Sequence, residues 1–292
     1  MIFTIQNNDL ICKIESVGAE IRSLIDKKTG KEYIWQIDES IWGSSSPVLF
    51  PAIGKIKSGH LKYRGQAYDM PKHGIIRHNC QLVFEQYSDS KCSFTLVSSA
   101  KTLKQYPFQF SFKVQYELIE NRLVMTYMIQ NRDDIEMYFN CGGHTAYSCQ
   151  LDEETSLLDY IIEFPKTIEL KAVTLGDSGL LSDKIRDIPS LDNSLQLTEN
   201  LFDDDALIFE NLNVNWVRLR KKDSKKGVVV KFKDYPNLAL WSKPGADYVC
   251  VEPWLGLPDR ENESDNITKK STFKKLQPNQ KYSIDIETVI ER

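Results

Sequence analysis

The chain has 292 residues, of which 41% are hydrophobic and 27% are charged, and its formal net charge is −4 at pH 7. These values are close to the averages of soluble globular proteins, which excludes intrinsic disorder. The 37 basic residues are scattered along the sequence rather than gathered in a stripe, which excludes the electrostatic footprint of a nucleic-acid-binding protein.

The N-terminal region, residues 3–36, predicts short strands separated by Asn-Asn-Asp and Thr-Gly turns. The opening residues MIFTIQNNDL lack the basic and apolar regions of a signal peptide, and no apolar run approaches the ~18 residues of a membrane span. We therefore expect a cytoplasmic protein without a membrane partner.

The segment FQFSFKVQYEL predicts a long half-buried strand, because its apolar residues alternate with polar ones. The residues on the apolar face are Phe108, Phe110, Phe112, Val114, Tyr116 and Leu118. After the turn IENR the chain continues as LVMTYMIQN, so residues 108–131 are predicted to form a β-hairpin.

The C-terminal third repeats this pattern. NWVRLR and VVVKFK predict a second hairpin with the basic residues 220–227 at its exposed tip, and residues 281–290 predict a closing strand. Residues 175–205, rich in Gly, Asp, Ser and Pro, are expected to form a long functional loop or an edge cover. No repeat of 20–50 residues is visible, so the prediction is an all-β protein, a single large antiparallel β-sandwich domain over residues 1–292.

The cysteines indicate buried free thiols rather than disulfides or a metal site. There are six, and none forms a CxxC pair: Cys12, Cys80, Cys92, Cys141, Cys149 and Cys250. Because closely spaced ligand pairs are missing, we expect no zinc.

Four segments that interrupt the strands carry most of the reactive side chains: 45–56 (SSPVLFPAIGKI), 70–78 (MPKHGIIRH), 142–149 (GGHTAYSC) and 248–259 (YVCVEPWLGLPD). Glu252 follows an apolar run, where an unpartnered carboxylate is costly. It is therefore either hydrogen-bonded in the core or part of a polar pocket.

Two of the four histidines lie beside glycine, which permits close backbone approach or a positive φ and can aim the side chain that follows. His73 precedes Gly74 and His144 follows Gly142-Gly143, so these two are candidates for function, ahead of His60 and His78. The alternative for each is a packed core or turn histidine.

The sequence lacks the G-x-S-x-G elbow, the P-loop and the Rossmann glycine pattern. Cys141 could suggest a thiol nucleophile, but on a strand it would point away from a neighbouring histidine. The remaining histidines and carboxylates, with aromatic residues, suit a sugar, since aromatic faces cover its C–H groups and polar side chains bind its hydroxyls. The aromatic candidates, each of which could instead be core, are Trp42, Tyr147, Trp241 and Trp254.

The ordered set SPVLFPAIGKI, MPKHGIIRH, GGHTAYSC, LFDDDALIF and YVCVEPWLGLPD resembles the aldose 1-epimerase (galactose mutarotase-like) family, in particular its LacX-type branch, over nearly the whole chain. The resemblance implies a large antiparallel β-supersandwich that interconverts the α and β anomers of aldoses without a cofactor or metal. It also implies a small-molecule sugar, free or phosphorylated, as partner; monomer and homodimer both stay open.

The resemblance assigns roles by position. His144 matches the family's general acid, Glu252 its general base and His73 a substrate-binding histidine. Lys55 stands where many relatives have an arginine that contacts the sugar, and it keeps the charge without the planar fork. Asp205 matches a sugar-binding aspartate, with Asp203 and Asp204 as alternative registers.

Anomer exchange removes the proton of the C1 hydroxyl and protonates the ring oxygen, which a Glu252 carboxylate and a His144 imidazolium would do. The stretch HGIIRH also resembles HGFAR of hexose-6-phosphate 1-epimerases, so a phosphate site of Lys55, Arg77 and Lys243 is a rival reading. A non-catalytic carbohydrate-binding or sensing protein is a second rival.

Overall fold

The structure, a computed structural model, describes residues 1–152 and 154–292. Within these residues, strands dominate and the helices are four short 3₁₀ turns: η1 Lys57–Gly59, η2 Thr102–Lys104, η3 Leu157–Asp159 and η4 Ile267–Lys269. The strands are β1 Ile2–Gln6, β2 Leu10–Glu15, β3 Ile21–Asp26, β4 Val48–Leu49, β5 His60–Tyr63, β6 Gln66–Asp69, β7 Val83–Ser88, β8 Lys91–Val97, β9 Phe110–Ile119, β10 Arg122–Asn131, β11 Met137–Phe139, β12 Gly142–Gly143, β13 Thr145–Ser148, β14 Tyr160–Glu163, β15 Leu170–Leu175, β16 Leu181–Ile188, β17 Ser194–Gln196, β18 Leu207–Phe209, β19 Trp216–Lys221, β20 Gly227–Lys231, β21 Asn237–Trp241, β22 Tyr248–Trp254, β23 Lys274–Leu276 and β24 Lys281–Glu291.

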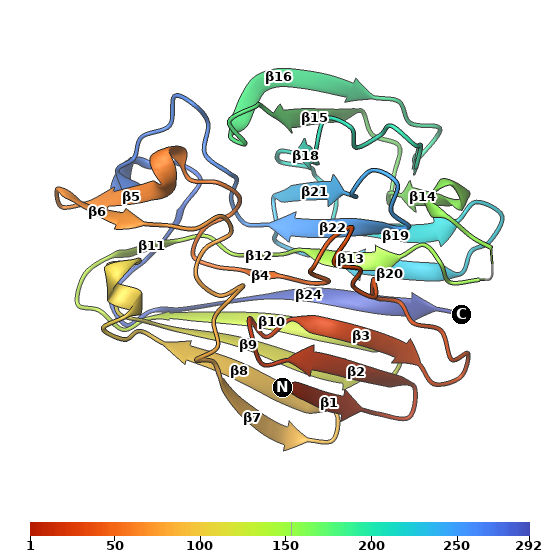
Figure 1. Cartoon of the computed structure of the whole chain (residues 1–292), viewed down its shortest axis with the longest axis horizontal. Coiled ribbons are helices and arrows are strands. Elements are labelled where there is room, and N and C mark those ends of the chain that lie inside the picture. The colour runs from red at the N-terminus through yellow and green to blue at the C-terminus, as the bar shows by residue number, and fades with distance from the viewer. Residues whose placement is uncertain (153) are drawn as a thin grey trace.

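Two large sheets make up most of the molecule (Figure 1). The nine-stranded sheet has the order β17-β14-β19-β20-β24-β10-β9-β8-β7, and the eight-stranded sheet runs β16-β15-β18-β21-β22-β12-β4 with β13 paired to β22. A separate three-stranded sheet, β1-β2-β3, contains the N-terminal strands. The neighbouring strands pair antiparallel, so the predicted all-β antiparallel fold is confirmed.

The core is built from strand faces of period two. On β9 and β10 buried and half-buried residues alternate along all ten positions of each strand. The aromatic face predicted from Phe108 to Leu118 is buried throughout, and β9 pairs with β10 as the predicted hairpin. The second predicted hairpin (β19 and β20) and the closing strand β24 are also confirmed.

Residues 175–205 differ from the expected loop, because they contain β16 and β17. These strands lie at the ends of the eight- and nine-stranded sheets respectively. Most side chains of β16 (LSDKIRDI) are half-buried or exposed, as is usual for a strand with a neighbour on one side only. Of the two alternatives, the loop was wrong, because a polar edge strand lacks the apolar alternation of an internal one, whereas a position at the sheet edges agrees with the edge cover.

The described residues contain no disulfide, and the cysteines are free thiols. Five of them are buried as expected, whereas Cys80 is exposed. The described residues also include no helix with the length and hydropathy needed to cross a bilayer.

Candidate active site

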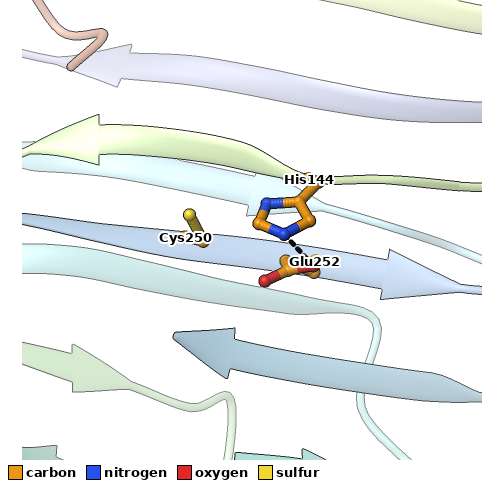
Figure 2. A group of neighbouring side chains, drawn as sticks. All are labelled: His144, Cys250 and Glu252. Atoms are coloured by element: carbon orange, nitrogen blue, oxygen red, sulfur yellow. Dashed lines mark ion pairs between the residues drawn. The ribbon is translucent and has the colours of Figure 1, made fainter. Parts of the chain in front are cut away.

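His144 and Glu252 face each other across neighbouring strands of the eight-stranded sheet. Gly142 on β12 pairs with Trp254 and Thr145 on β13 pairs with Val251, so the common register places His144 opposite Glu252 on β22. Directly opposite residues of an antiparallel pair have Cβ atoms ~4.5–5.5 Å apart. The Nε2 atom of His144 and the Oε2 atom of Glu252 lie 3.2 Å apart (Figure 2).

The glycine pair before His144 allows a close approach of backbone and side chains. A Cβ atom on Gly142 would lie 2.6 Å from Cδ1 of Trp254, and one on Gly143 would lie 2.8 Å from Cδ1 of Ile286. Neither glycine has a positive φ. The sequence suggested either a positive φ or a close approach to neighbouring groups for these glycines. The structure shows the close approach.

His73 is held in a defined tautomer by Gly54. Its backbone N–H donates to the Gly54 carbonyl at 2.8 Å, and the Gly54 N–H donates to Nδ1 of the His73 ring at 3.2 Å. Since Nδ1 accepts, the proton of the neutral ring is on Nε2. Burial lowers the pKa of His73 well below its usual value, so the ring is a neutral donor near pH 7.

The His144–Glu252 pair lies at a cavity of about 230 Å³. Drug-sized pockets span ~300–1,000 Å³, so this cavity suits a smaller ligand. All six residues selected from the sequence line it: Lys55, His73, Arg77, His144, Asp205 and Glu252. Three indole rings also line it, those of Trp42, Trp241 and Trp254.

The aromatic rings pack around the His144 imidazole. The Trp42 ring stacks on it with 5.3 Å between centroids, and Trp241 meets it edge-on at 5.9 Å. Tyr147, the fourth aromatic candidate, is 1% exposed in the core, where its hydroxyl lies 2.6 Å from that of Thr288. The structure thus places three of the four aromatic candidates at the cavity and assigns Tyr147 to the core.

The charged candidates occupy the cavity wall in different ways. Nζ of Lys55 donates to the Ser178 carbonyl at 2.5 Å, and Nη2 of Arg77 donates to Oγ of Ser44 at 3.1 Å. Asp205 is exposed and has a φ of 73°, and its Oδ1 accepts from the N–H of the next residue at 2.8 Å.

Of the three consecutive aspartates, Asp205 lines the cavity, and Asp203 and Asp204 do not. The two histidines ranked lower, His60 and His78, also lie outside it, and so does Cys141, which is buried in the core.

Comparison with known proteins shows the family of the chain. The family model described as aldose 1-epimerase matches residues 1–283. The chromosomal protein LacX of Lactococcus lactis subsp. lactis is 31% identical over 291 residues, which cover 95% of each chain. The chain belongs to the aldose 1-epimerase family.

Solved structures agree with this family and with the predicted galactose mutarotase-like fold. The galactose mutarotase related enzyme of Lactobacillus acidophilus has a TM-score of 0.93 and 32% identity, covering 100% of this chain and 98% of that one. A galactose mutarotase-like protein of Lactobacillus casei has a TM-score of 0.92 and 29% identity, covering 100% of both chains.

In this member of the aldose 1-epimerase family, burial favours the neutral forms of the central pair. Burial lowers the pKa of His144 to about 3, with a further contribution from the Arg77 charge. Burial also raises the pKa of Glu252 well above its usual value, against the nearby charges of Lys72 and Arg77. Burial therefore favours a neutral imidazole beside a carboxylic acid over the imidazolium and carboxylate expected from the sequence, because desolvation penalises both charges.

Sequence reasoning missed Lys72, whose side chain lines the cavity and whose charge acts on His73, His144 and Glu252. Its position directly before His73 in MPKHGIIRH was the available signal. Lys243, considered only for a phosphate site, lines the cavity as well.

A buried ion pair supports one wall of the cavity. Oδ2 of Asp259 lies 2.5 Å from Nζ of Lys270, and both side chains are fully buried. The same oxygen accepts from the Lys57 N–H at 2.9 Å, and the Asp259 N–H donates to the Lys55 carbonyl at 3.2 Å. The loop after β22 is thereby joined to the segment that carries Lys55.

A larger hollow of about 960 Å³ lies against β7, β8, β9, β10 and β24 of the nine-stranded sheet. Its described lining includes Val83, Val97, Lys113 and Met128 but no histidine. The smaller cavity is therefore the better candidate for chemistry.

Proposed function

We propose that the protein is an aldose 1-epimerase that interconverts the α and β anomers of a hexose by acid/base ring opening. The observation that carries the proposal is the opposed pair His144 and Glu252, 3.2 Å apart in a cavity lined by three indole rings. One side chain is an acid and the other a base, and both reach the same small space.

The proposed reaction begins with the closed sugar bound between the two groups. Glu252 takes the proton of the C1 hydroxyl while His144 protonates the ring oxygen, so the C1–O5 bond breaks and an aldehyde forms. After rotation about the C1–C2 bond, the O5 hydroxyl attacks the other face of C1. His144 takes the O5 proton and Glu252 returns a proton to O1, which restores both groups.

The pair holds one proton in total at every stage of this cycle. The charged arrangement, imidazolium and carboxylate, accompanies the closed sugar, and the neutral arrangement accompanies the open aldehyde. Burial favours the neutral arrangement, and the cationic side chains of Lys72 and Arg77 favour the carboxylate. The same two cations disfavour the imidazolium of His144, so the neutral arrangement is the more stable of the two.

The remaining cavity residues suit the binding of a pyranose. The indole face of Trp42 or Trp241 covers C–H groups of the ring, and Nε2–H of His73 donates to a hydroxyl oxygen. The Asp205 carboxylate accepts from hydroxyl groups, whereas Lys55 donates to them. This chemistry uses side chains of the chain itself and calls for no cofactor, and a cytoplasmic location remains part of the proposal.

A phosphorylated hexose is the second candidate substrate. Four cationic side chains line the cavity, Lys55, Lys72, Arg77 and Lys243, although the whole chain carries a net charge of −4. Apart from Glu252, the described residues contribute one carboxylate to the lining, that of Asp205. Such an excess of positive charge favours an anionic group on the sugar.

Proton NMR of freshly dissolved anomers tests both candidates. Purified α-glucose, α-galactose and their 6-phosphates are followed with and without the protein, and the uncatalysed rate is subtracted. Faster approach to the anomeric equilibrium supports the epimerase, and the ratio of rates on free and phosphorylated sugars decides the substrate class. Sugar binding by calorimetry without any acceleration would instead identify a non-catalytic carbohydrate-binding protein.

A further inference from the structure

A third side chain adjoins the central pair and is not used by the proposed reaction. Cys250 lies two residues before Glu252 on β22, so both side chains point to the same side of the sheet (Figure 2). The thiol sulfur of Cys250, Nε2 of His144 and a carboxylate oxygen of Glu252 all lie within 4.8 Å of one another. All three residues are buried.

The contact between His144 and Glu252 is short but is not an aligned hydrogen bond. Among the described residues, Oε2 of Glu252 has no hydrogen-bond partner although Glu252 is 1% exposed, and Nδ1 of His144 has none either. A tetrahedral ion with bonds of ~2.0–2.2 Å to nitrogen and oxygen holds these ligands ~3.4 Å apart. The observed 3.2 Å separation is close to that spacing.

We propose that His144, Cys250 and Glu252 form a binding site for a thiophilic divalent cation such as Zn²⁺, and that the bound ion switches off the acid/base pair. Nitrogen, sulfur and oxygen donors are the ligands that Zn²⁺ takes in proteins, and open zinc sites have three protein ligands and one free position. His144 and Glu252 line the cavity while Cys250 packs behind them with Trp35, Ala146 and Tyr248. The fourth position of the ion therefore faces the cavity.

Charge balance supports the site. On binding, the Cys250 thiol releases its proton to solvent and the His144–Glu252 pair releases the one proton that it shares, because thiolate, carboxylate and neutral imidazole are the ligand forms. The two anionic ligands then match the charge of the ion, which limits the cost of placing it near the cations Lys72 and Arg77. Once coordinated, Nε2 of His144 carries no proton to give and the Glu252 oxygen that faces it is bound to the ion, so the proposed anomer exchange stops.

The experiment measures binding and inhibition separately. Calorimetry with Zn²⁺, and the absorption of a thiolate–Co²⁺ bond with Co²⁺, report binding whether or not the protein is an epimerase. Inhibition rests on the proposed function and is followed as anomer exchange with increasing Zn²⁺, reversed by a chelator. Mg²⁺ is the control ion, because it prefers all-oxygen sites.

Variants of single cysteines decide the ligand. Cys250→Ala is expected to keep basal exchange and to lower Zn²⁺ affinity by at least ~10–100-fold, the loss seen when only outer partners of a metal ligand are removed. Cys250→Ser, which keeps the volume, should likewise lose the Co²⁺–thiolate absorption. Cys80→Ser removes the exposed thiol and should change neither readout.

Absence of Zn²⁺ binding, or equal Zn²⁺ affinity in wild type and Cys250→Ala, would overturn the site. So would a loss of binding in Cys80→Ser. If binding is found as described but no anomer exchange is detected with any sugar, the metal site stands and the proposed function fails.

Discussion

Replacing Glu252 with glutamine is the most direct test of the proposed chemistry. The side chain is 1% exposed and its Oε2 lies 3.2 Å from Nε2 of His144, so the amide occupies the same space and keeps the contact. Glutamine cannot accept the C1 hydroxyl proton. A positioned acid or base typically contributes ~10²–10⁴-fold, so kcat/KM should fall by that factor, or ~2.7–5.4 kcal/mol in the activation free energy.

A His144 variant and the double variant help to interpret the loss of kcat/KM in Glu252→Gln. His144→Gln alone should cost a similar factor, and the double variant should cost no more than the larger single loss, because the two groups share one proton and act as a unit. Independent contributions would instead multiply. Asp204→Asn, an exposed acid outside the cavity, is the matched control and should retain full activity.

Polarimetry on fresh α-galactose or α-glucose measures these rates after the uncatalysed rate is subtracted. Thermal unfolding shows whether each variant is folded. The free energy of unfolding of Glu252→Gln should stay within about 1 kcal/mol of the wild-type value, because no volume is lost and the neutral form of the Glu252 side chain is already favoured. Full activity of a folded Glu252→Gln protein would remove this residue from the role of base, and a multiplicative double variant would refute the shared proton.

Three further predictions follow from the same geometry. First, kcat/KM should stay constant as the pH falls until about pH 3, because burial lowers the pKa of His144 to about 3 and the pair gains a second proton, and so loses its base, only below that pH. A decrease in kcat/KM near pH 4.5, in protein shown by circular dichroism to be folded, would instead indicate a solvent-exposed Glu252. Second, Gly142→Ala should lower kcat/KM at least about tenfold and lower the free energy of unfolding in urea by ~1–3 kcal/mol, because the new Cβ would lie 2.6 Å from Cδ1 of Trp254. Unchanged activity and stability would show that β22 can move to accommodate the methyl group. Third, Lys270→Met should lower the free energy of unfolding by ~3–5 kcal/mol, because it leaves the Asp259 carboxylate buried and unpaired. Adding Asp259→Asn, which keeps an acceptor for the Lys57 N–H, should recover much of the loss, whereas an unchanged free energy of unfolding in Lys270→Met would mean that the pair is hydrated.

The confirmed parts of the fold depend on local patterns. Strand β9 could be predicted because Phe110, Phe112 and Val114 alternate with polar residues, and a half-buried strand has the same period of two. Strand β16 was missed because its sheet neighbour lies on one side only, so its sequence is polar. An edge strand is defined by its partner in the sheet, which no short window of sequence contains.

For the candidate site, too, some features could be predicted from the sequence and others depend on the tertiary structure. The residue types were readable from the sequence, since His73, His144 and Glu252 stand out among strands and glycines, and the family resemblance gave them roles. Only the tertiary structure decided how these residues lie relative to one another. The strand register places His144 opposite Glu252, and Asp205 rather than its two neighbours lines the cavity. Cys250 and Lys72 lie near the pair only because the chain is folded. The protonation of the pair belongs to this second group, because pKa values depend on burial and on charges from distant segments, and both arise only when the strands have come together.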